Sequence, residues 1–231
     1  MHSYFLYFYL TMDFTKRKDL VFLVLAGFFI TNAIVAELIG GKVVEFFGLF
    51  KQSVGIILWP VVFLLTDLIN EHYGKQGVRK LTYITVGLIA YMFVAISISI
   101  AIKTTPGSPV DDQSFKAVFG QGQWIIIGSI TAFLISQLVD VYIFWMFRNR
   151  TGNKHIWLRA TGSTVVSQLI DTFVVQFIAF VIPAKWTLME FTHNAAWGYL
   201  FKLLVALCLI PLIYVGHFAI NKFMRVKHEE L

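Results

Sequence analysis

The 231-residue sequence has a single cysteine and few charged residues. Because Cys208 is alone, a disulfide within the chain is excluded, and a cysteine–histidine metal site is not expected. Charged residues make up 14% of the chain, against about 25% in an average soluble domain, whereas 58% of the residues are hydrophobic. This composition indicates a membrane protein.

Motifs of several enzyme classes are also missing. The sequence has no H-E-x-x-H zinc motif, no P-loop and no evident serine–histidine dyad. Asp140 and Asp171 could face each other as in an intramembrane aspartyl protease, but the motifs that surround the aspartates of that class are absent. The sequence therefore favours transport over catalysis, and it predicts neither a cofactor nor a metal.

Long apolar segments are what the chain has in abundance. A membrane-spanning helix needs about 20 mostly apolar residues. The segments that meet this condition are 20–40, 54–72, 81–103, 123–147, 160–182 and 196–223. We expect an all-α integral membrane protein with six transmembrane helices in one domain, 20–224. Residues 1–19 would form a cytoplasmic or interfacial lead, and 225–231 a cytoplasmic tail.

The basic residues between these segments are distributed unevenly. Thirteen lysines and arginines fall at the termini and in the second and fourth loops, against five in the other three loops. Lysine and arginine concentrate on the cytoplasmic side of membrane proteins. The asymmetry predicts that both termini are cytoplasmic, and charges clustered in short loops argue against a nucleic-acid partner.

Polar side chains inside the expected spans are costly, and they indicate function by default. Those residues are Asn32, Glu37, Thr66, Asp67, Asn70, Glu71, His72, Gln137, Asp140, Gln168, Asp171, Gln176 and Lys202. Trp59, just before Pro60, is either a wall of a ligand pocket or a packing residue. Interhelical hydrogen bonding is the alternative explanation for a lone glutamine or serine.

Two of these polar groups repeat one pattern. The stretch ISQLVD ends at Asp140, and VSQLID ends at Asp171. In each, the glutamine and the aspartate share one helix face. Because the two helices would be antiparallel neighbours, we expect both pairs to line one cavity between mid-membrane and the inner leaflet. Glu37 and Lys202 would both lie near the outer end, where an ion pair would act as a gate or as a static tie.

Four stretches carry a resemblance to a known family. TDLINEHYGKQGVRK (66–80), ISQLVD, VSQLID and RNRTGNKHIWLR (148–159) resemble the queuosine precursor transporter family, also called the vitamin uptake transporter family. The resemblance covers about residues 20 to 225. It implies an inner-membrane, multi-pass importer with six helices and cytoplasmic termini. The implied substrates are 7-cyano-7-deazaguanine, 7-aminomethyl-7-deazaguanine or queuine, which feed queuosine synthesis in tRNA.

The chemistry of a guanine-like base suits these residues. A carboxylate accepts the adjacent N–H and amino groups as a bidentate pair, and amides satisfy the carbonyl and ring nitrogens. We expect Asp140 or Asp171 to bind this edge and Trp59 or a phenylalanine to stack on the ring. The expected hydrogen-bonding residues are Gln137, Gln168 and Asn32. Asp67 and Asn70 either complete the pocket or form a gate with Arg79, and Glu71 marks the inner boundary.

Other readings remain at this stage. The chain could be the substrate-binding subunit of an energy-coupling-factor transporter. Such subunits typically present alanines separated by three other residues on their first helix, a spacing that Ala26, Ala33 and Ala36 do not make. An intramembrane enzyme and a purely structural helical protein are further alternatives. The order of the helices is compatible with an inverted repeat of three plus three, and a homodimer is left open.

Overall fold

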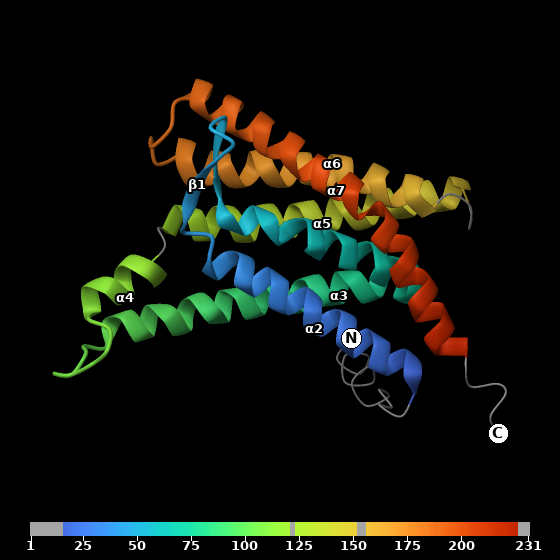
Figure 1. Ribbon diagram of the computed structural model, residues 1–231, viewed down its shortest axis with the longest axis horizontal. Helices are drawn as coiled ribbons and strands as arrows, with labels where there is room; N and C mark the ends of the chain where they lie inside the picture. Colours follow the sequence, from blue (N-terminus) through green and yellow to red (C-terminus); the bar gives the residue numbers. More distant parts are fainter. Residues whose placement is uncertain (1–15, 121–122, 152–155, 226–231) are drawn as a thin grey trace, which may run out of the picture.

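The computed structural model describes residues 16–120, 123–151 and 156–225, which form a bundle of long helices with one small hairpin (Figure 1). The long helices are α2 (Arg17–Leu38), α3 (Trp59–Ala101), α5 (Gln123–Thr151), α6 (Ile156–Gln176) and α7 (Leu188–Arg225). The stretches built on these five helices are long and apolar enough to cross a membrane. The all-α membrane class expected from the sequence is confirmed at this level.

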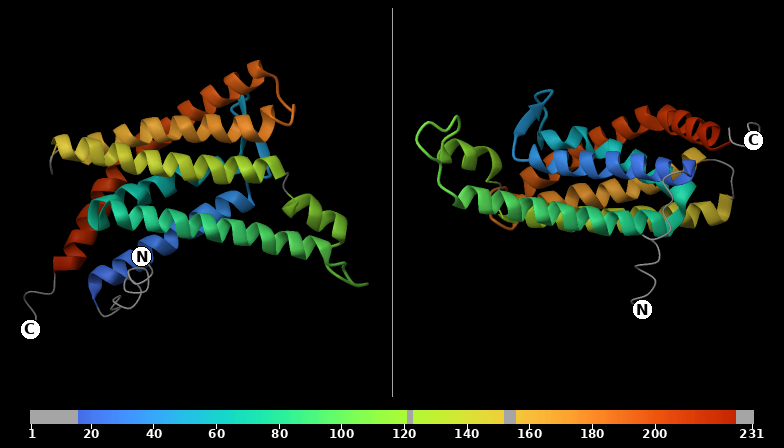
Figure 2. Two further views of the ribbon diagram at one scale, coloured as in Figure 1. Left: turned by 180° about the vertical axis from the view of Figure 1, so that it is seen from behind. Right: turned by 90° about the horizontal axis from the view of Figure 1, so that it is seen from below.

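Helix α3 covers two of the spans that the sequence predicts. Its 43 residues would extend about 65 Å as a straight helix, about twice the thickness of the hydrocarbon core of a bilayer. It is not straight, because Gly74 has φ 75° and ψ 176° within it, a conformation that suits a residue without a side chain. Figures 1 and 2 show α3 as two arms that run in opposite directions.

Two ends of the bundle can be distinguished. The hairpin of β1 (Val43–Phe46) and β2 (Phe50–Ser53) lies at one, which we call the hairpin end (Figure 1). Helix α2 begins and α7 ends at the other, the terminal end, where Arg17 Nη1 donates to the Phe223 carbonyl at 3.0 Å. The turn of α3 is at the same end, because the Tyr73 hydroxyl donates to the Lys18 carbonyl at 2.7 Å.

Several local features were not predicted from the sequence. In the first loop, β1 and β2 pair antiparallel with Phe46 opposite Phe50. The loop after α3 contains the short helix α4 (Asp112–Phe119). Pro60 lies in the first turn of α3, after a 3-10 turn, η1 (Val54–Ile57). The proline therefore begins the helix and does not bend it, since its missing N–H costs nothing there.

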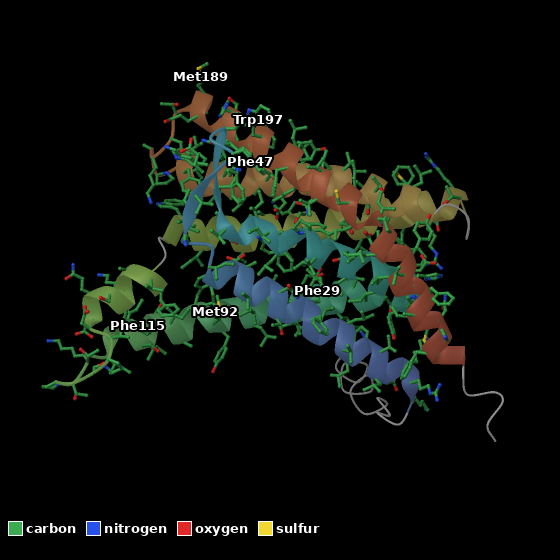
Figure 3. The ribbon with its side chains drawn as sticks, viewed as in Figure 1. Phe29, Phe47, Met92, Phe115, Met189 and Trp197 are labelled. Carbon is green, nitrogen blue, oxygen red and sulfur yellow. The ribbon has the colours of Figure 1, made fainter. Side chains whose placement is uncertain are left out.

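The burial pattern fits a bundle that is surrounded by lipid. Phe29 and Phe133 are fully buried, and their rings lie 6.2 Å apart between α2 and α5. Large apolar side chains also cover the outer surface, such as Phe28 at 61% and Phe218 at 67% exposure. Figure 3 shows Met189 pointing away from the bundle at the hairpin end. In water such a surface would be unfavourable, whereas in a bilayer it faces hydrocarbon.

Candidate functional site

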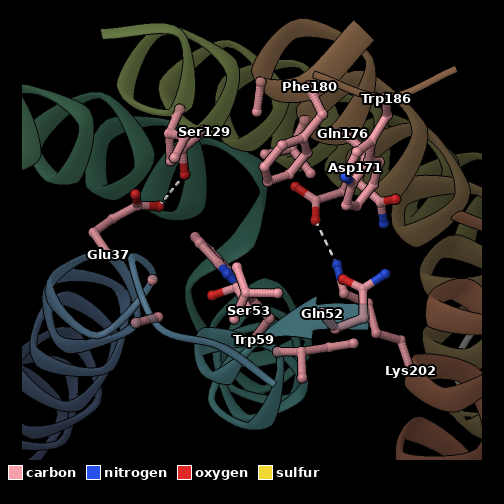
Figure 4. A pocket seen from close by; sticks show the side chains of 17 residues that line it. Glu37, Gln52, Ser53, Trp59, Ser129, Asp171, Gln176, Phe180, Trp186 and Lys202 are labelled. Atoms are coloured by element: carbon pink, nitrogen blue, oxygen red, sulfur yellow. Dashed lines mark hydrogen bonds and ion pairs between the residues drawn. The ribbon is translucent and has the colours of Figure 1, made fainter. Parts of the chain in front are cut away.

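A cavity of about 80 Å³ lies in the hairpin half of the bundle (Figure 4). Residues of α2, the hairpin, the start of α3, α5, α6, α7 and the segment after α6 line it. Its polar lining consists of Glu37, Gln52, Ser53, Ser129, Asp171, Gln176 and Lys202. So many elements converge here that a movement of any helix changes the shape of the cavity.

Charged groups lie on opposite walls of the cavity. Lys202 Nζ of α7 is 2.8 Å from Asp171 Oδ2 of α6, and both side chains are about 95% buried. On the other wall, the Ser129 hydroxyl of α5 donates to Glu37 Oε1 of α2 (Figure 4). The sequence suggested that Lys202 would pair with Glu37, whereas the structure pairs it with Asp171. Both acids nevertheless face the same space.

Two glutamines complete the polar lining. Gln176 is 3% exposed, and neither atom of its amide has a hydrogen-bond partner among the described residues. Gln52 Nε2 donates to the Asn194 carbonyl at 2.9 Å, and Asn194 Oδ1 accepts from the Lys51 backbone at 2.9 Å. The hairpin is thereby fixed to α7. A buried amide without partners is costly, so Gln176 is a group that a guest could satisfy.

Aromatic rings provide flat walls. The Trp186 ring stacks on Phe180 with centroids 4.1 Å apart and planes 17° apart, and Trp59 packs against Phe133 at 5.3 Å. Trp59, Phe180 and Trp186 all line the cavity. Trp186 also borders a more open hollow of about 400 Å³ beside the hairpin. This ring therefore separates the cavity from a wider hollow at the hairpin end.

The repeated pattern of the sequence forms a reciprocal contact between α5 and α6. Ser167 of α6 donates to Asp140 Oδ1 of α5 at 2.9 Å, and Ser136 of α5 donates to Asp171 Oδ1 of α6 at 3.3 Å. Each serine comes four residues before its own aspartate and binds the aspartate of the other helix. Because the helices are antiparallel, the two aspartates lie on opposite sides of this contact.

The structure separates the two aspartates that the sequence placed in one cavity. Asp171 lines the cavity, whereas Asp140 does not and is fully buried between the helices. Because α5 and α6 run in opposite directions, the aspartate of the repeated motif lies toward the terminal end on α5 and toward the hairpin end on α6. The sequence-based prediction did not take this into account. Trp59 lines the cavity as predicted, and Gln137 accepts from the Thr66 hydroxyl at 3.2 Å, deeper in the bundle.

Other predicted residues lie away from the cavity. Asn32 donates to the Phe28 carbonyl of its own helix. Asn70 and Gln168 are buried in the interior, and Asp67 borders a cavity of about 20 Å³ between α3, α6 and α7. At the terminal end, Glu71 lies 3.6 Å from Arg148. Arg79 is exposed and is not among the residues that border these cavities.

Sequence reasoning missed part of the lining. Gln52 lies in a loop segment that carries no periodic signal, and Trp186 resembled an ordinary aromatic residue at a membrane interface. Gln176 was visible as a buried polar residue, five positions after Asp171, but it lies outside the repeated motif. Its position near the outer end of a span, beside a motif aspartate, was the available signal.

Comparisons with known proteins agree with the membrane architecture. Residues 53–216 match the profile of the vitamin uptake transporter family. A protein of Bacillus subtilis (strain 168) named "Probable queuosine precursor transporter" is 31% identical over 178 residues, which cover 76% of this chain and 75% of the relative. A protein of Haemophilus influenzae with the same name is 30% identical over 71% of this chain and 68% of its own length.

A more distant relative has a related name. The "Queuosine precursor transporter" of Escherichia coli (strain K12) is 25% identical over 68% of this chain and 69% of its own length. No solved structure matches the chain.

Proposed function

Because the chain belongs to the vitamin uptake transporter family, we propose that it imports a queuosine precursor of the 7-deazaguanine class across the bacterial inner membrane. The family is one of transporters, and the chain is a multi-pass membrane protein. The observation that carries the proposal is the cavity itself. It places two carboxylates, two amides and two tryptophans around one space inside a membrane-spanning bundle.

The arrangement of the helices supports six spans with cytoplasmic termini. The two arms of α3 run in opposite directions, so each crosses the bundle once (Figure 1). At the terminal end, Lys18 lies over Tyr73 and Lys75 over Tyr142, and Arg148 pairs with Glu71. This end therefore gathers basic residues, as a cytoplasmic face does. The hairpin end is then extracytoplasmic, and the cavity faces the side from which substrate arrives.

The base would lie between the carboxylate walls. Asp171 is the acceptor for its adjacent N–H and amino groups, since an ionised carboxylate makes strong paired hydrogen bonds. Lys202 must release one oxygen of Asp171 for this, and it then becomes a donor to the carbonyl of the base. The free amide of Gln176 offers both a donor and an acceptor to the ring. Trp59 and Trp186 provide stacking faces.

The cavity must widen when the base enters. Its volume of about 80 Å³ is small beside the about 300–1,000 Å³ of typical ligand sites. Trp186 separates it from the hollow of about 400 Å³, so a rotation of this ring would join the two spaces. We therefore expect binding to be accompanied by movement of Trp186 and quenching of tryptophan fluorescence.

Binding of 7-cyano-7-deazaguanine to the purified protein tests the proposal. We expect saturable binding that guanine competes with weakly and an unrelated vitamin does not affect. Asp171→Asn replaces one acceptor oxygen by a donor and should weaken binding at least about 30-fold, which corresponds to about 2 kcal/mol for a charged hydrogen bond. Asn32→Ala is the control, because in the described part of the chain Asn32 forms its hydrogen bond with its own helix.

The possible outcomes distinguish an error in the proposed substrate from an error in the proposed binding site. If a folded sample binds no 7-deazaguanine, the substrate class is wrong. If it binds the base but Asp171→Asn binds it equally well, the class stands and the cavity is not the binding site. Chemical alteration of the base during incubation would instead identify an enzyme.

A further inference from the structure

Asp140 is a fully buried acid that pairs with none of the described cationic side chains. Lys202 pairs with Asp171 and Arg148 pairs with Glu71, whereas no described cationic side chain is paired with Asp140. One of its oxygens accepts from Ser167 at 2.9 Å, and Oδ2 has no partner among the described residues although the side chain is fully buried. An uncompensated charge in such a place costs several kcal/mol.

The neighbours of Asp140 that the structure describes supply a hydrogen bond but no positive charge. Ser167 on α6 faces it directly, and Asp67 and Glu71 on α3 are acidic. On α7, Lys202 binds Asp171, and His217 Nδ1 lies 3.1 Å from His72 Nε2. The described residues thus supply no cation to Asp140, whereas a cation from solution can balance its charge.

A line of buried polar groups connects Asp140 with both halves of the bundle. Among the described residues, Gln137 Nε2 and Gln168 Oε1 have no hydrogen-bond partner, and neither has either amide atom of Asn70. Thr66 contacts Gln137, and the first arm of α3 runs parallel to α5. Asn70, one turn after Thr66, is therefore at the level of Asp140, one turn after Gln137. Waters that bridge such groups would form a path for protons.

We propose that Asp140 carries the proton whose movement down its gradient drives the uptake of the base. This inference rests on the proposed function and concerns its energy source. The carboxylate takes one proton from the extracytoplasmic side, crosses to the inward-facing state as a neutral acid, and releases the proton to the cytoplasm. One proton then accompanies each neutral base, and the protein returns to its initial charge.

A proton suits this position better than a metal cation. A hard metal ion takes about six oxygen ligands, whereas Asp140 offers one unpartnered oxygen beside a serine hydroxyl. A cavity between α3, α6 and α7, lined by Thr164 one turn before Ser167, measures about 20 Å³, which is room for about one water. Protonation needs only the free oxygen.

Proteoliposomes that contain the full chain test the proposal with labelled 7-cyano-7-deazaguanine. An inward gradient of one pH unit can support at most about tenfold accumulation when one proton accompanies each base. We expect accumulation by the wild type, collapse on adding a protonophore, and no accumulation with a sodium gradient alone. Asp140→Asn mimics the protonated acid, so it should exchange external for internal base without a gradient but should not accumulate it.

The repeated motif provides matched control variants, because Asp171 and Ser136 are the counterparts of Asp140 and Ser167. Asp171→Asn should lose binding and exchange together, whereas Asp140→Asn should lose only the response to the gradient. Ser167→Ala removes the hydroxyl next to Asp140 and should shift the pH profile of uptake. Ser136→Ala removes the equivalent hydroxyl next to Asp171 and should change the half-saturating base concentration without shifting the profile.

Four outcomes overturn the inference. They are accumulation by Asp140→Asn equal to that of the wild type, a wild type that ignores the pH gradient, accumulation driven by sodium alone, and an unshifted profile in Ser167→Ala. The last measurement applies even if Asp140→Asn does not fold. Absence of binding by the wild type would refute the proposed substrate instead, so the two failures are distinguishable.

Discussion

The two ends of the bundle differ in how they are closed. At the hairpin end, the cavity of about 80 Å³ adjoins a hollow of about 400 Å³ through Trp186. At the terminal end, the helices are tied by polar contacts, namely Glu71 with Arg148, His72 with His217, and Arg17 with the Phe223 carbonyl. The hairpin end is closed by one ring pair and by a small hairpin that two hydrogen bonds fix to α7, whereas the terminal end is closed by polar contacts among the helices themselves.

This difference indicates which state the structure represents. A transporter that works by alternating access opens its site to one side at a time. Under the proposed function, the groups that would bind the base lie near the hairpin end, and the contacts at the opposite end would have to break before a base could leave there. The structure would then correspond to a state that receives substrate at the hairpin end. The predictions below test this asymmetry from the largest expected effect to the smallest.

The largest effect is expected at the buried ion pair beside the cavity. Lys202→Met leaves Asp171 buried without the cation 2.8 Å away, and removing one partner of a buried pair costs about 3–5 kcal/mol. We expect a large drop in the thermal unfolding temperature in detergent. Lys222→Met, which changes an exposed lysine of the same helix, should leave the unfolding temperature nearly unchanged.

The double variant decides whether charge or packing is responsible. Lys202→Met combined with Asp171→Asn removes both charges, so it should recover most of the stability that Lys202→Met loses. If the double variant is as unstable as the single one, the lysine stabilises the hairpin half by packing its alkyl chain, and the ion pair contributes little.

This ion pair also shows how much of the site could be predicted from the sequence. Asp171 and Lys202 were both recognisable as costly residues in apolar segments, and the break near Gly74 was expected between 72 and 81. Their pairing was not predictable, because it depends on the relative rotation and depth of α6 and α7. Patterns along one helix carry no information about either quantity.

The hairpin escaped prediction for a different reason. Its strands have four residues each, too few for a period-two pattern to stand out between two long apolar segments. The turn contains Phe47 and Gly48, both with positive φ, and only the glycine is a turn signal in sequence. Consequently Gln52, which the hairpin brings to the cavity, could not be assigned to the site.

Thiol labelling compares the accessibility of the two halves. The chain has one cysteine, so Cys208→Ser gives a background for Ser53→Cys, which lines the cavity, and Ser163→Cys, which is fully buried deeper in α6. A membrane-impermeant maleimide should label the first at least about tenfold faster, since reaction at a buried site requires local opening. The deazaguanine should slow labelling of Ser53→Cys. Equal labelling rates would mean that the two halves open equally.

The smallest effect is expected where the hairpin meets α7. A Cβ atom at Gly198 would overlap Gln52 Nε2, so Gly198→Ala must displace the amide that donates to the Asn194 carbonyl. Moving Gln52 out of the cavity wall should remove about one hydrogen bond to the base, which is worth about 1 kcal/mol, or about a fivefold weaker affinity. Gly27→Ala and Gly87→Ala, where an added Cβ meets nothing within 4 Å, should not weaken binding.

The result at Gly198 would define what the hairpin does. The amide of Gln52 is at the end of a flexible side chain, so it can move aside with little loss of stability. The unfolding temperature should therefore hardly change. Weaker binding at unchanged stability would make the hairpin a wall of the binding site. Unchanged binding would reduce it to a cover, and the asymmetry between the two ends would then depend on the Trp186 and Phe180 rings alone.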